Sequence, residues 1–291
     1  MTTGRGAISA LIAVLAVVAS TVGADATPTT PTIIGGEPVP DGKYPFQVAL
    51  LDETLSGDDY DKQFCGGSLI GSHWVLTAAH CVTDDGGQEI DPAGLAVAVG
   101  RTVLTSELGE RFAAAEIRLH PGFRGATLSN DAALIRLSGS SSITPIRLAV
   151  AADDRLEAIG TSLTVAGWGD TKPGDGVDFA DRLREVAVPV VGDAACAAAY
   201  TDDGGIAATR ELCAGSEGLD SCEGDSGGPL FATKGGSFLQ LGIVGWGTGC
   251  EQLSHPGVYT EVNSPDIRRF IIANTTTWGW LKSKVRRPGP S

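Results

Sequence analysis

The feature that most constrains this chain is a series of short apolar or alternating runs separated by clusters of turn-forming residues. Such clusters include DDGG at residues 84–87 and KPGDG at residues 172–176. Runs of this kind are typical of strands, and few segments show helical spacing, so the chain is predicted to be all-β. Strands spaced in this way indicate an antiparallel sandwich or barrel. The predicted strands cover residues 46–51, 68–77, 95–99, 111–119, 132–137, 162–168, 183–191, 238–246 and 258–262.

One helix is predicted, close to the end of the chain. Residues 264–266 (SPD) offer cap chemistry, and apolar residues follow at helical spacing from Ile267. Beyond about residue 275 the sequence turns polar and basic, so residues 276–291 are predicted to form a frayed tail. The acidic segment at residues 52–62 lacks apolar periodicity and is predicted to be a surface loop.

The N-terminal segment has the pattern of an export signal. Arg5 precedes an apolar stretch at residues 7–18, which is shorter than the roughly 20 residues that a membrane-spanning helix needs. We therefore predict a signal peptide at residues 1–26, a short propeptide at residues 27–32, and a secreted, extracellular protein. No later segment is apolar enough to span a membrane, so no membrane partner is expected.

The composition excludes two classes of protein. Hydrophobic residues make up 42% and charged residues 19%, which supplies a core and excludes a disordered chain. Acidic residues outnumber basic residues by 35 to 21, and the net charge of -14 repels phosphate groups. Nucleic acid is therefore not an expected partner.

Six cysteines follow the export signal, and an even number in an exported chain indicates three disulfides. Their spacing alone leaves the pairing open. Neither C-x-x-C nor H-x-x-x-H occurs, so a structural zinc site is the poorer explanation and no metal is assigned. The six residues are Cys65, Cys81, Cys196, Cys213, Cys222 and Cys250.

The strongest candidate for chemistry is Ser226, in the sequence GDSGG at residues 224–228. Glycines on both sides leave the serine open to a substrate, and the backbone amides can turn toward an oxyanion. The G-x-S-x-G pattern also fits the nucleophile elbow of lipases and esterases. That elbow needs a helix after the serine and a later acid and histidine, whereas Gly-Gly-Pro follows Ser226 and His255 is the only later histidine.

A serine nucleophile needs a base, and histidine is the usual one. His80 ends an apolar strand beside a cysteine, where a disulfide can fix its position. Asp131 opens another apolar strand, and a carboxylate drawn inside there needs a hydrogen-bonding partner such as imidazole. His73, His120 and His255 lie beside turn residues and are predicted to have surface or packing roles.

Together these segments resemble the chymotrypsin-like (trypsin family) serine proteases, closest in pattern to actinobacterial trypsins. Three motifs come in the order His, Asp, Ser: TAAHC at residues 77–81, NDAAL at 130–134 and GDSGGPL at 224–230. Four more matches are IIGG at 33–36, CGGSLI at 65–70, AGWG at 166–169 and PGVY at 256–259. The resemblance covers about residues 33–272.

The resemblance implies two six-stranded antiparallel β-barrels with a C-terminal α-helix, forming one protease domain at residues 33–275 with the active site in the cleft between the barrels. It implies an acyl-enzyme mechanism with Ser226 as nucleophile, His80 as general base and Asp131 orienting the imidazolium. The amides of Gly224 and Ser226 would form the oxyanion hole. The implied disulfides are Cys65–Cys81, Cys196–Cys213 and Cys222–Cys250.

The resemblance also implies a zymogen. Cleavage before Ile33 would create an amino terminus that pairs with Asp225, next to the nucleophile. Loss of one partner from a buried charge pair is strongly destabilising, so this pairing would order the site. The bond to be cut follows Thr32 rather than Lys or Arg, so a different protease is expected to cut it.

Specificity depends most on Asp220, which matches the pocket-floor aspartate of trypsins and implies cleavage after Arg or Lys. Gly247 and Gly257 match pocket walls without side chains, and Trp246 belongs to the same substrate-binding segment. Gly245 also lies there, but the family usually has a serine at this place near the triad aspartate. We expect reduced turnover from this departure, and not inactivity.

No cofactor is expected to be required for catalysis. Asp193, Glu211 and Glu261 resemble positions that bind structural calcium in some actinobacterial trypsins, with solvated surface acids as the alternative.

The expected partners are protein or peptide substrates with Arg or Lys before the scissile bond, and protein protease inhibitors; the protein is expected to be a monomer. The alternative function is a non-catalytic protease homologue that acts as a binding protein, although such homologues typically lose a triad residue.

Overall fold

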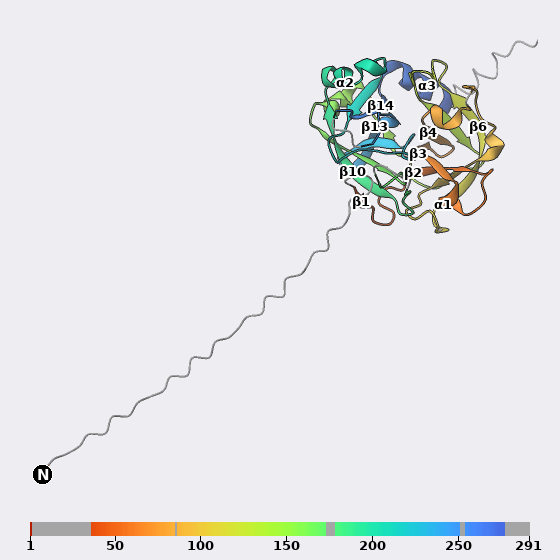
Figure 1. Ribbon diagram of the computed structural model, residues 1–291. Helices are drawn as coiled ribbons and strands as arrows, with labels where there is room; N and C mark the ends of the chain where they lie inside the picture. The colour runs from red at the N-terminus through yellow and green to blue at the C-terminus, as the bar shows by residue number, and fades with distance from the viewer. Residues whose placement is uncertain (2–35, 85, 173–177, 251–253, 277–291) are drawn as a thin grey trace, which may run out of the picture. The chain divides into compact units, whose positions relative to one another are not determined.

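The structure is a computed structural model that describes residues 1, 36–84, 86–172, 178–250 and 254–276. Its first half contains a closed antiparallel β-barrel in the strand order β2-β3-β4-β7-β6-β5, in which β5 pairs back with β2 (Figure 1). The six strands are β2 (Gln47–Asp52), β3 (Gln63–Gly71), β4 (Trp74–Thr77), β5 (Leu95–Val99), β6 (Glu110–Leu119) and β7 (Ala133–Leu137).

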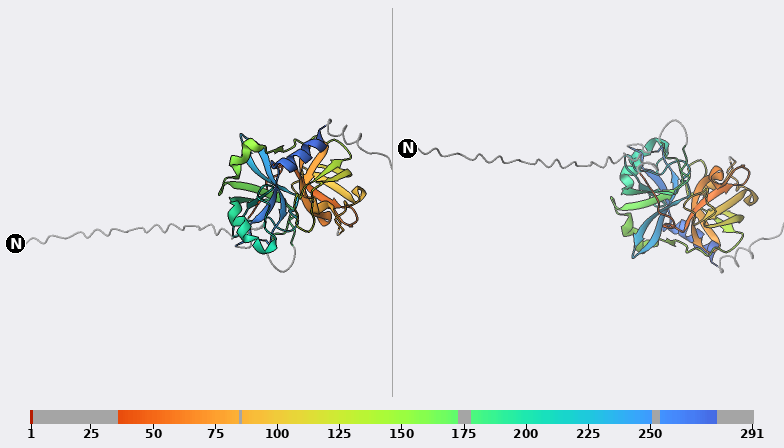
Figure 2. Two further views of the ribbon diagram at one scale, coloured as in Figure 1. Left: turned by 90° about the horizontal axis from the view of Figure 1, so that it is seen from above. Right: turned by 90° about the horizontal axis from the view of Figure 1, so that it is seen from below.

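The second half contains another antiparallel barrel, in the order β9-β10-β11-β14-β13-β12, with β12 pairing back with β9. Figure 2 shows this barrel in green to blue beside the first barrel in orange to yellow. Two short strands extend its sheet: β1 (Glu37–Pro38) pairs with β10, and β8 (Arg147–Leu148) pairs with β13. The barrel strands are β9 (Ser162–Gly167), β10 (Arg184–Val191), β11 (Glu211–Ala214), β12 (Pro229–Lys234), β13 (Ser237–Trp246) and β14 (Gly257–Glu261).

Each barrel has its own apolar interior, as the strand pattern of the sequence predicts. In β2 and β5 nearly every residue is buried, including Val48, Leu50 and Val97. The second interior contains residues such as Val165 and Tyr259 from β9 and β14. The predicted all-β class and the two six-stranded barrels are therefore confirmed.

Some strand boundaries were wrong. The single strand predicted at residues 68–77 is two strands, because the chain turns at Ser72 and His73 between β3 and β4. The strands β1, β8, β11 and β12 were not predicted. The strands β1, β8 and β11 are too short to show the alternating pattern that marks a strand. The strand β12 begins directly after the glycine-rich sequence around Ser226, which hides its start.

The predicted C-terminal helix is α3 (Pro265–Thr275). Its apolar face, including Ile267 and Phe270, packs against residues of the first barrel. The helix starts with Pro265, a residue that suits the first position of a helix. The expected side-chain cap is absent, because the Ser264 hydroxyl makes no cap hydrogen bond. The helix α2 (Asp193–Ala199) was not predicted, because its alanine-rich sequence shows no apolar periodicity.

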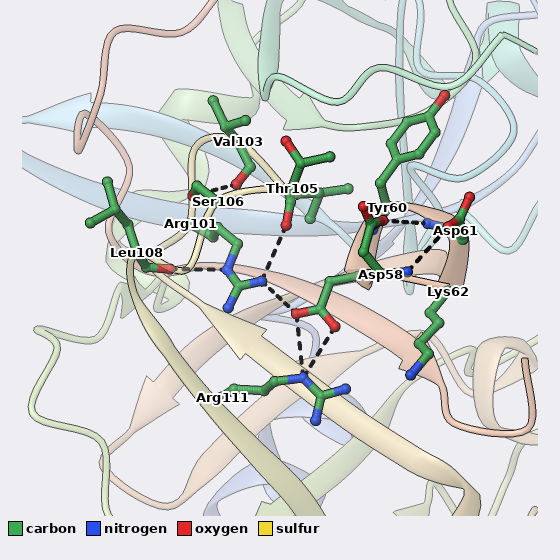
Figure 3. A network of polar contacts seen from close by, with 12 residues as sticks. Asp58, Tyr60, Asp61, Lys62, Arg101, Val103, Thr105, Ser106, Leu108 and Arg111 are labelled. Carbon is green, nitrogen blue, oxygen red and sulfur yellow. Dashed lines mark hydrogen bonds and ion pairs between the residues drawn. The ribbon is translucent and has the colours of Figure 1, made fainter. Parts of the chain in front are cut away.

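The prediction of a surface loop at residues 52–62 was wrong for its last part, where α1 (Asp59–Lys62) forms. Figure 3 shows its N-terminus, where Asp58 accepts from the amides of Tyr60 and Asp61 in a capping box. The Asp59 side chain is only 13% exposed and pairs with Arg101, which is 7% exposed. A buried ion pair therefore anchors this acidic segment to the first barrel.

Three predicted segments lie outside the described residues. They are the signal peptide at residues 1–26, apart from Met1, the propeptide at residues 27–32, and the tail at residues 276–291, apart from Thr276. Ile33, the expected new amino terminus, also lies outside the described residues.

Candidate active site

A cavity of about 250 Å³ lies where the two barrels meet. His80 reaches it from a short 3-10 helix (His80–Val82) that follows β4 of the first barrel. Ser226 reaches it from the loop between β11 and β12 of the second barrel. Asp220 lines the same cavity, so the predicted base, nucleophile and specificity residue come together here.

Asp131 lies two residues before the start of β7 and is fully buried. Its Oδ2 lies 2.6 Å from His80 Nδ1, and its Oδ1 accepts from the His80 backbone amide at 2.8 Å. Both carboxylate oxygens therefore hold the same residue, which fixes the imidazole ring and makes Nδ1 the protonated nitrogen of the neutral tautomer. Nε2 is then the basic nitrogen.

The charge of the cavity favours a protonated imidazole. Burial by itself lowers the pKa of His80, but the hydrogen bond and the charge of Asp131 outweigh it, so the pKa of His80 is raised. Glu223, which also lines the cavity, acts in the same direction through its charge. An imidazole in this setting can accept a proton during a reaction and hold it.

The backbone around Ser226 has a turn that only glycine adopts easily. Gly224 and Gly227 have φ values of 88° and 80°, in the left-handed region. The Ser226 carbonyl accepts from the Gly66 amide of β3 at 2.7 Å, and the Gly227 amide donates to the Val244 carbonyl at 2.8 Å. Within the described residues, the amides of Gly224 and Ser226 donate no backbone hydrogen bond, so both are available to an oxyanion.

Asp225, beside the serine, is 1% exposed. Its carboxylate accepts from the amides of Gly169 at 2.9 Å and Cys222 at 3.0 Å. Burial raises the pKa of Asp225 to about 6, because neutral amide donors offset only part of the desolvation cost. Among the described residues, no basic side chain forms an ion pair with it.

Asp220 is 4% exposed, and its Oδ1 accepts from the Ser221 amide at 2.8 Å. A Cβ atom on Gly257 would lie 2.9 Å from this oxygen, so only glycine leaves the approach to the carboxylate open. Gly247 and Trp246 also line the cavity. The arrangement is a cavity lined by the buried carboxylate of Asp220, with glycines at positions 247 and 257 that add no side-chain bulk beside it.

Gly245 lies beside the histidine–aspartate pair. A Cβ atom at this position would lie 3.9 Å from Asp131 Oδ2, so a hydroxyl there is within reach of the carboxylate. The same Cβ atom would lie 2.9 Å from the Val258 carbonyl oxygen, which is tight enough to shift the backbone locally.

Three disulfides fix the segments around the cavity, in the pairing that the resemblance implies. Cys65–Cys81 joins β3 to the 3-10 helix of His80, and Cys222–Cys250 joins the serine loop to the segment after β13. Cys196–Cys213 joins α2 to β11.

The other candidates lie elsewhere. Among the described residues that line the cavity His80 is the only histidine, while His120 packs edge-on against Phe270 and His255 against Tyr200. The predicted calcium ligands are not a preformed cluster: among the described residues, the one group of close ligand atoms is Cys65, His80 and Cys81, which includes a disulfide.

Sequence reasoning missed Gln63, the first residue of β3. Its side chain is buried, and its Nε2 donates to the Gly224 carbonyl at 2.9 Å. The Phe179 ring packs against Gly224, since a Cβ atom on Gly224 would lie 2.7 Å from this ring. Nothing in a single sequence marks Gln63, because it stands between charged and aromatic residues outside any motif.

Comparison with known proteins then gives the family, because the family model described as Trypsin matches residues 33–271. The chain belongs to the trypsin family. It is 37% identical over 234 residues to a trypsin from Saccharopolyspora erythraea, covering 80% of this chain and 94% of that protein. It is 35% identical over 262 residues to a trypsin-like protease from Streptomyces glaucescens, covering 89% of this chain and 87% of that protein. A tryptase from Mus musculus is 37% identical to this chain over 240 residues, covering 79% of this chain and 84% of the tryptase.

This trypsin-family chain is a serine endopeptidase that acts on protein or peptide substrates, and the resemblance seen in its sequence is confirmed. In the part of the chain that the structure describes, no helix is long and apolar enough to cross a membrane.

Proposed function

We propose that the protein is a secreted endopeptidase that cleaves after Arg or Lys and is made as a zymogen. The observation that carries this proposal is the position of Asp220, which is 4% exposed and lines the same cavity as Ser226 and His80. A guanidinium or ammonium group that enters the cavity pairs with this carboxylate, and the carbonyl carbon of the same residue then lies at the serine.

The chemistry follows from the hydrogen-bonded pair of Asp131 and His80 and from the position of Ser226 on the same cavity as His80. Ser226 Oγ adds to the substrate carbonyl while His80 Nε2 takes its proton, and Asp131 stabilises the imidazolium that results. The amides of Gly224 and Ser226 donate to the oxyanion; each such donor typically contributes about 10²–10³-fold to the rate. His80 returns the proton to the leaving amine, and water then hydrolyses the acyl-enzyme.

Hydrolysis of peptide amides tests the specificity. Protein that begins at Ile33 should cleave amides with Arg or Lys before the scissile bond, and Ser226→Ala should abolish the activity. Cleavage after Phe or Ala would retain the mechanism and refute the role of Asp220. Folded protein that cleaves none of the four would favour the non-catalytic alternative, which no feature of the described residues supports.

The burial of Asp225 supports activation by a new amino terminus. Burial raises the pKa of Asp225 to about 6 because its two amide donors offset only part of the desolvation cost, and a cation at Ile33 would stabilise the charged carboxylate further. We expect protein that keeps Thr32 before Ile33 to have kcat/KM lower by about a hundredfold or more, because an oxyanion donor is no longer held in place. Equal activity of the two forms would refute this mechanism.

Calcium binding by Asp193, Glu211 and Glu261 stays a prediction. The Glu211 carboxylate accepts from the Ala207 amide at 2.5 Å, and burial raises the pKa of Glu211 and of Glu261. A divalent cation would offset that cost. A melting temperature that calcium leaves unchanged would refute it. Protein protease inhibitors and a monomeric state also remain part of the proposal.

A further inference from the structure

A protease that cuts after Arg or Lys is surrounded by copies of itself, so its own basic residues are substrates unless the fold protects them. Proteolysis of a folded chain occurs at exposed loops whose backbone leaves its hydrogen bonds at little cost. Most basic residues in the described part of this chain are protected because they lie in β6, β7, β8, β10, β12, α1, α3 or the 3-10 helix at Ala151–Glu157.

Other basic residues lie outside strands and helices, but each forms an ion pair. Lys172 is protected twice, because the next residue in the sequence is proline, and a proline after a peptide bond hinders cleavage of that bond. The pairs are Lys43 with Glu185, Arg101 with Asp59, Lys172 with Asp178, Arg182 with Asp41 and Arg210 with Asp266.

Arg124 has neither kind of protection. It lies in the loop between β6 and β7, where residues 124–127 are exposed in succession. Its guanidinium donates only to the neighbouring Phe123 carbonyl, at 2.8 Å, and no acid among the described residues pairs with it. The next residue is Gly125, and a Cβ atom there would meet nothing within 4 Å, so the space beyond the peptide bond is open.

The same loop is conformationally strained. Leu128 and Asn130 have φ values of 49° and 54°, and they are the only non-glycine residues with positive φ in the described part of the chain. Asparagine tolerates this left-handed conformation, but a leucine side chain disfavours it, so opening of the loop releases the strain at Leu128. The Arg124 backbone is held by two hydrogen bonds, its amide to Ser129 and its carbonyl from Thr127, both at 3.1 Å.

We propose that the Arg124–Gly125 bond is a self-cleavage site, at which one molecule cuts another; this rests on the proposed cleavage after Arg or Lys. The Arg124 side chain enters the cavity above Asp220, and Ser226 Oγ adds to the Arg124 carbonyl carbon. The C–N bond to Gly125 breaks as His80 gives the serine's proton to the Gly125 nitrogen. One water then hydrolyses the acyl-enzyme, which releases the Arg124 carboxylate and restores Ser226.

The cut gives a two-chain protein without a covalent link. Cys65–Cys81 lies before the cut, and Cys196–Cys213 and Cys222–Cys250 lie after it. In the folded state the chains stay together, because β7 pairs with β4 and β6 of the first barrel. A denaturing gel without reductant therefore separates the two chains.

The experiment uses protein that begins at Ile33, incubated alone and analysed on such a gel, with N-terminal sequencing of each band. We expect two fragments, the second beginning Gly125-Ala126-Thr127. Arg124→Gln should give no such fragment, whereas the matched control Arg147→Gln, in β8, should be cut like the wild type. Ser226→Ala should stay intact alone and be cut at the same bond when a trace of wild-type protein is added.

Hydrolysis of Arg amides by the same samples separates the two proposals. If wild type and Arg124→Gln hydrolyse the amides and the Arg124–Gly125 bond stays intact, the self-cleavage site is refuted and the proposed function stands. A first internal cut at another bond refutes the site as well. Absence of Arg and Lys amide hydrolysis refutes the proposed function and the self-cleavage site with it. Cuts within residues 277–291 create no N-terminus at Gly125 and are recognised by sequencing.

Discussion

Asp59→Ala tests the conclusion that a buried ion pair anchors α1. The Asp59 carboxylate pairs with Arg101 and accepts from Arg111 Nε at 3.1 Å. Without it, the Arg101 guanidinium, which is 7% exposed, keeps only the carbonyls of Leu108 at 2.9 Å and Leu104 at 3.2 Å. A buried charge that loses its partner typically costs about 3–5 kcal/mol. Arg111 is 38% exposed and regains water, so it adds little.

We therefore expect Asp59→Ala to lower the melting temperature by roughly 10 °C, measured by circular dichroism on the Ser226→Ala background to prevent proteolysis. The matched control is Asp58→Ala in the same segment, which loses only the helix cap, at a cost of about 1 kcal/mol.

Adding Arg101→Met to Asp59→Ala removes the unpaired charge and should restore much of the lost stability. The reasoning is refuted if Asp59→Ala costs no more than Asp58→Ala, or if the double variant is less stable than Asp59→Ala alone.

Three further predictions concern other parts of the molecule. Burial raises the pKa of Glu157 and of Glu261 from the ordinary 4.5 to about 7. Between pH 4.5 and about pH 7 the folded state therefore binds more protons than the unfolded state, so the free energy of unfolding falls as the pH rises through this range. The melting temperature should be higher at about pH 5 than at about pH 8, and an undiminished difference in Glu157→Gln would contradict this cause. Gly245→Ser places a hydroxyl near Asp131 Oδ2 and should raise kcat; unchanged or lower kcat would show that the contact with the Val258 carbonyl dominates. Gln63→Leu removes the donor to the Gly224 carbonyl and should lower kcat several-fold with little change in KM, whereas a change in KM alone would refute a role in positioning Gly224.

The sequence predicts the barrels because their physical cause is local. Alternating apolar residues in β6 or β13 encode a strand facing a core, whatever the strand later pairs with. The same argument fails for α2, where alanines give no period, and for β12, which follows glycines. The disulfide Cys196–Cys213 holds α2, and pairing with the neighbouring strands β9 and β13 holds β12. These are tertiary contacts, which a local sequence pattern does not show.

The candidate site divides in the same way. His80, Asp131 and Ser226 each lie in a short motif, because the turn that presents each side chain needs particular neighbours. The contacts that hold these turns come from distant residues: Gln63 lies 161 positions before Gly224, and Tyr60 lies 119 before Phe179, whose carbonyl its hydroxyl reaches at 3.1 Å. Such residues can be found only once the chain is folded.

These distant contacts make the proposed oxyanion hole depend on both barrels. Gly224 belongs to the second barrel, yet its carbonyl is held by Gln63 of β3 in the first. The Ser226 carbonyl is held by Gly66 of the same strand at 2.7 Å, and Phe179, which packs on Gly224, is tied to Tyr60 of α1. A displacement of one barrel against the other would therefore move the amides of Gly224 and Ser226 away from His80. Because α1 is fixed to the first barrel through Asp59 and Arg101, the acidic segment that the sequence presents as a loop helps to hold the proposed catalytic residues in place across the cleft.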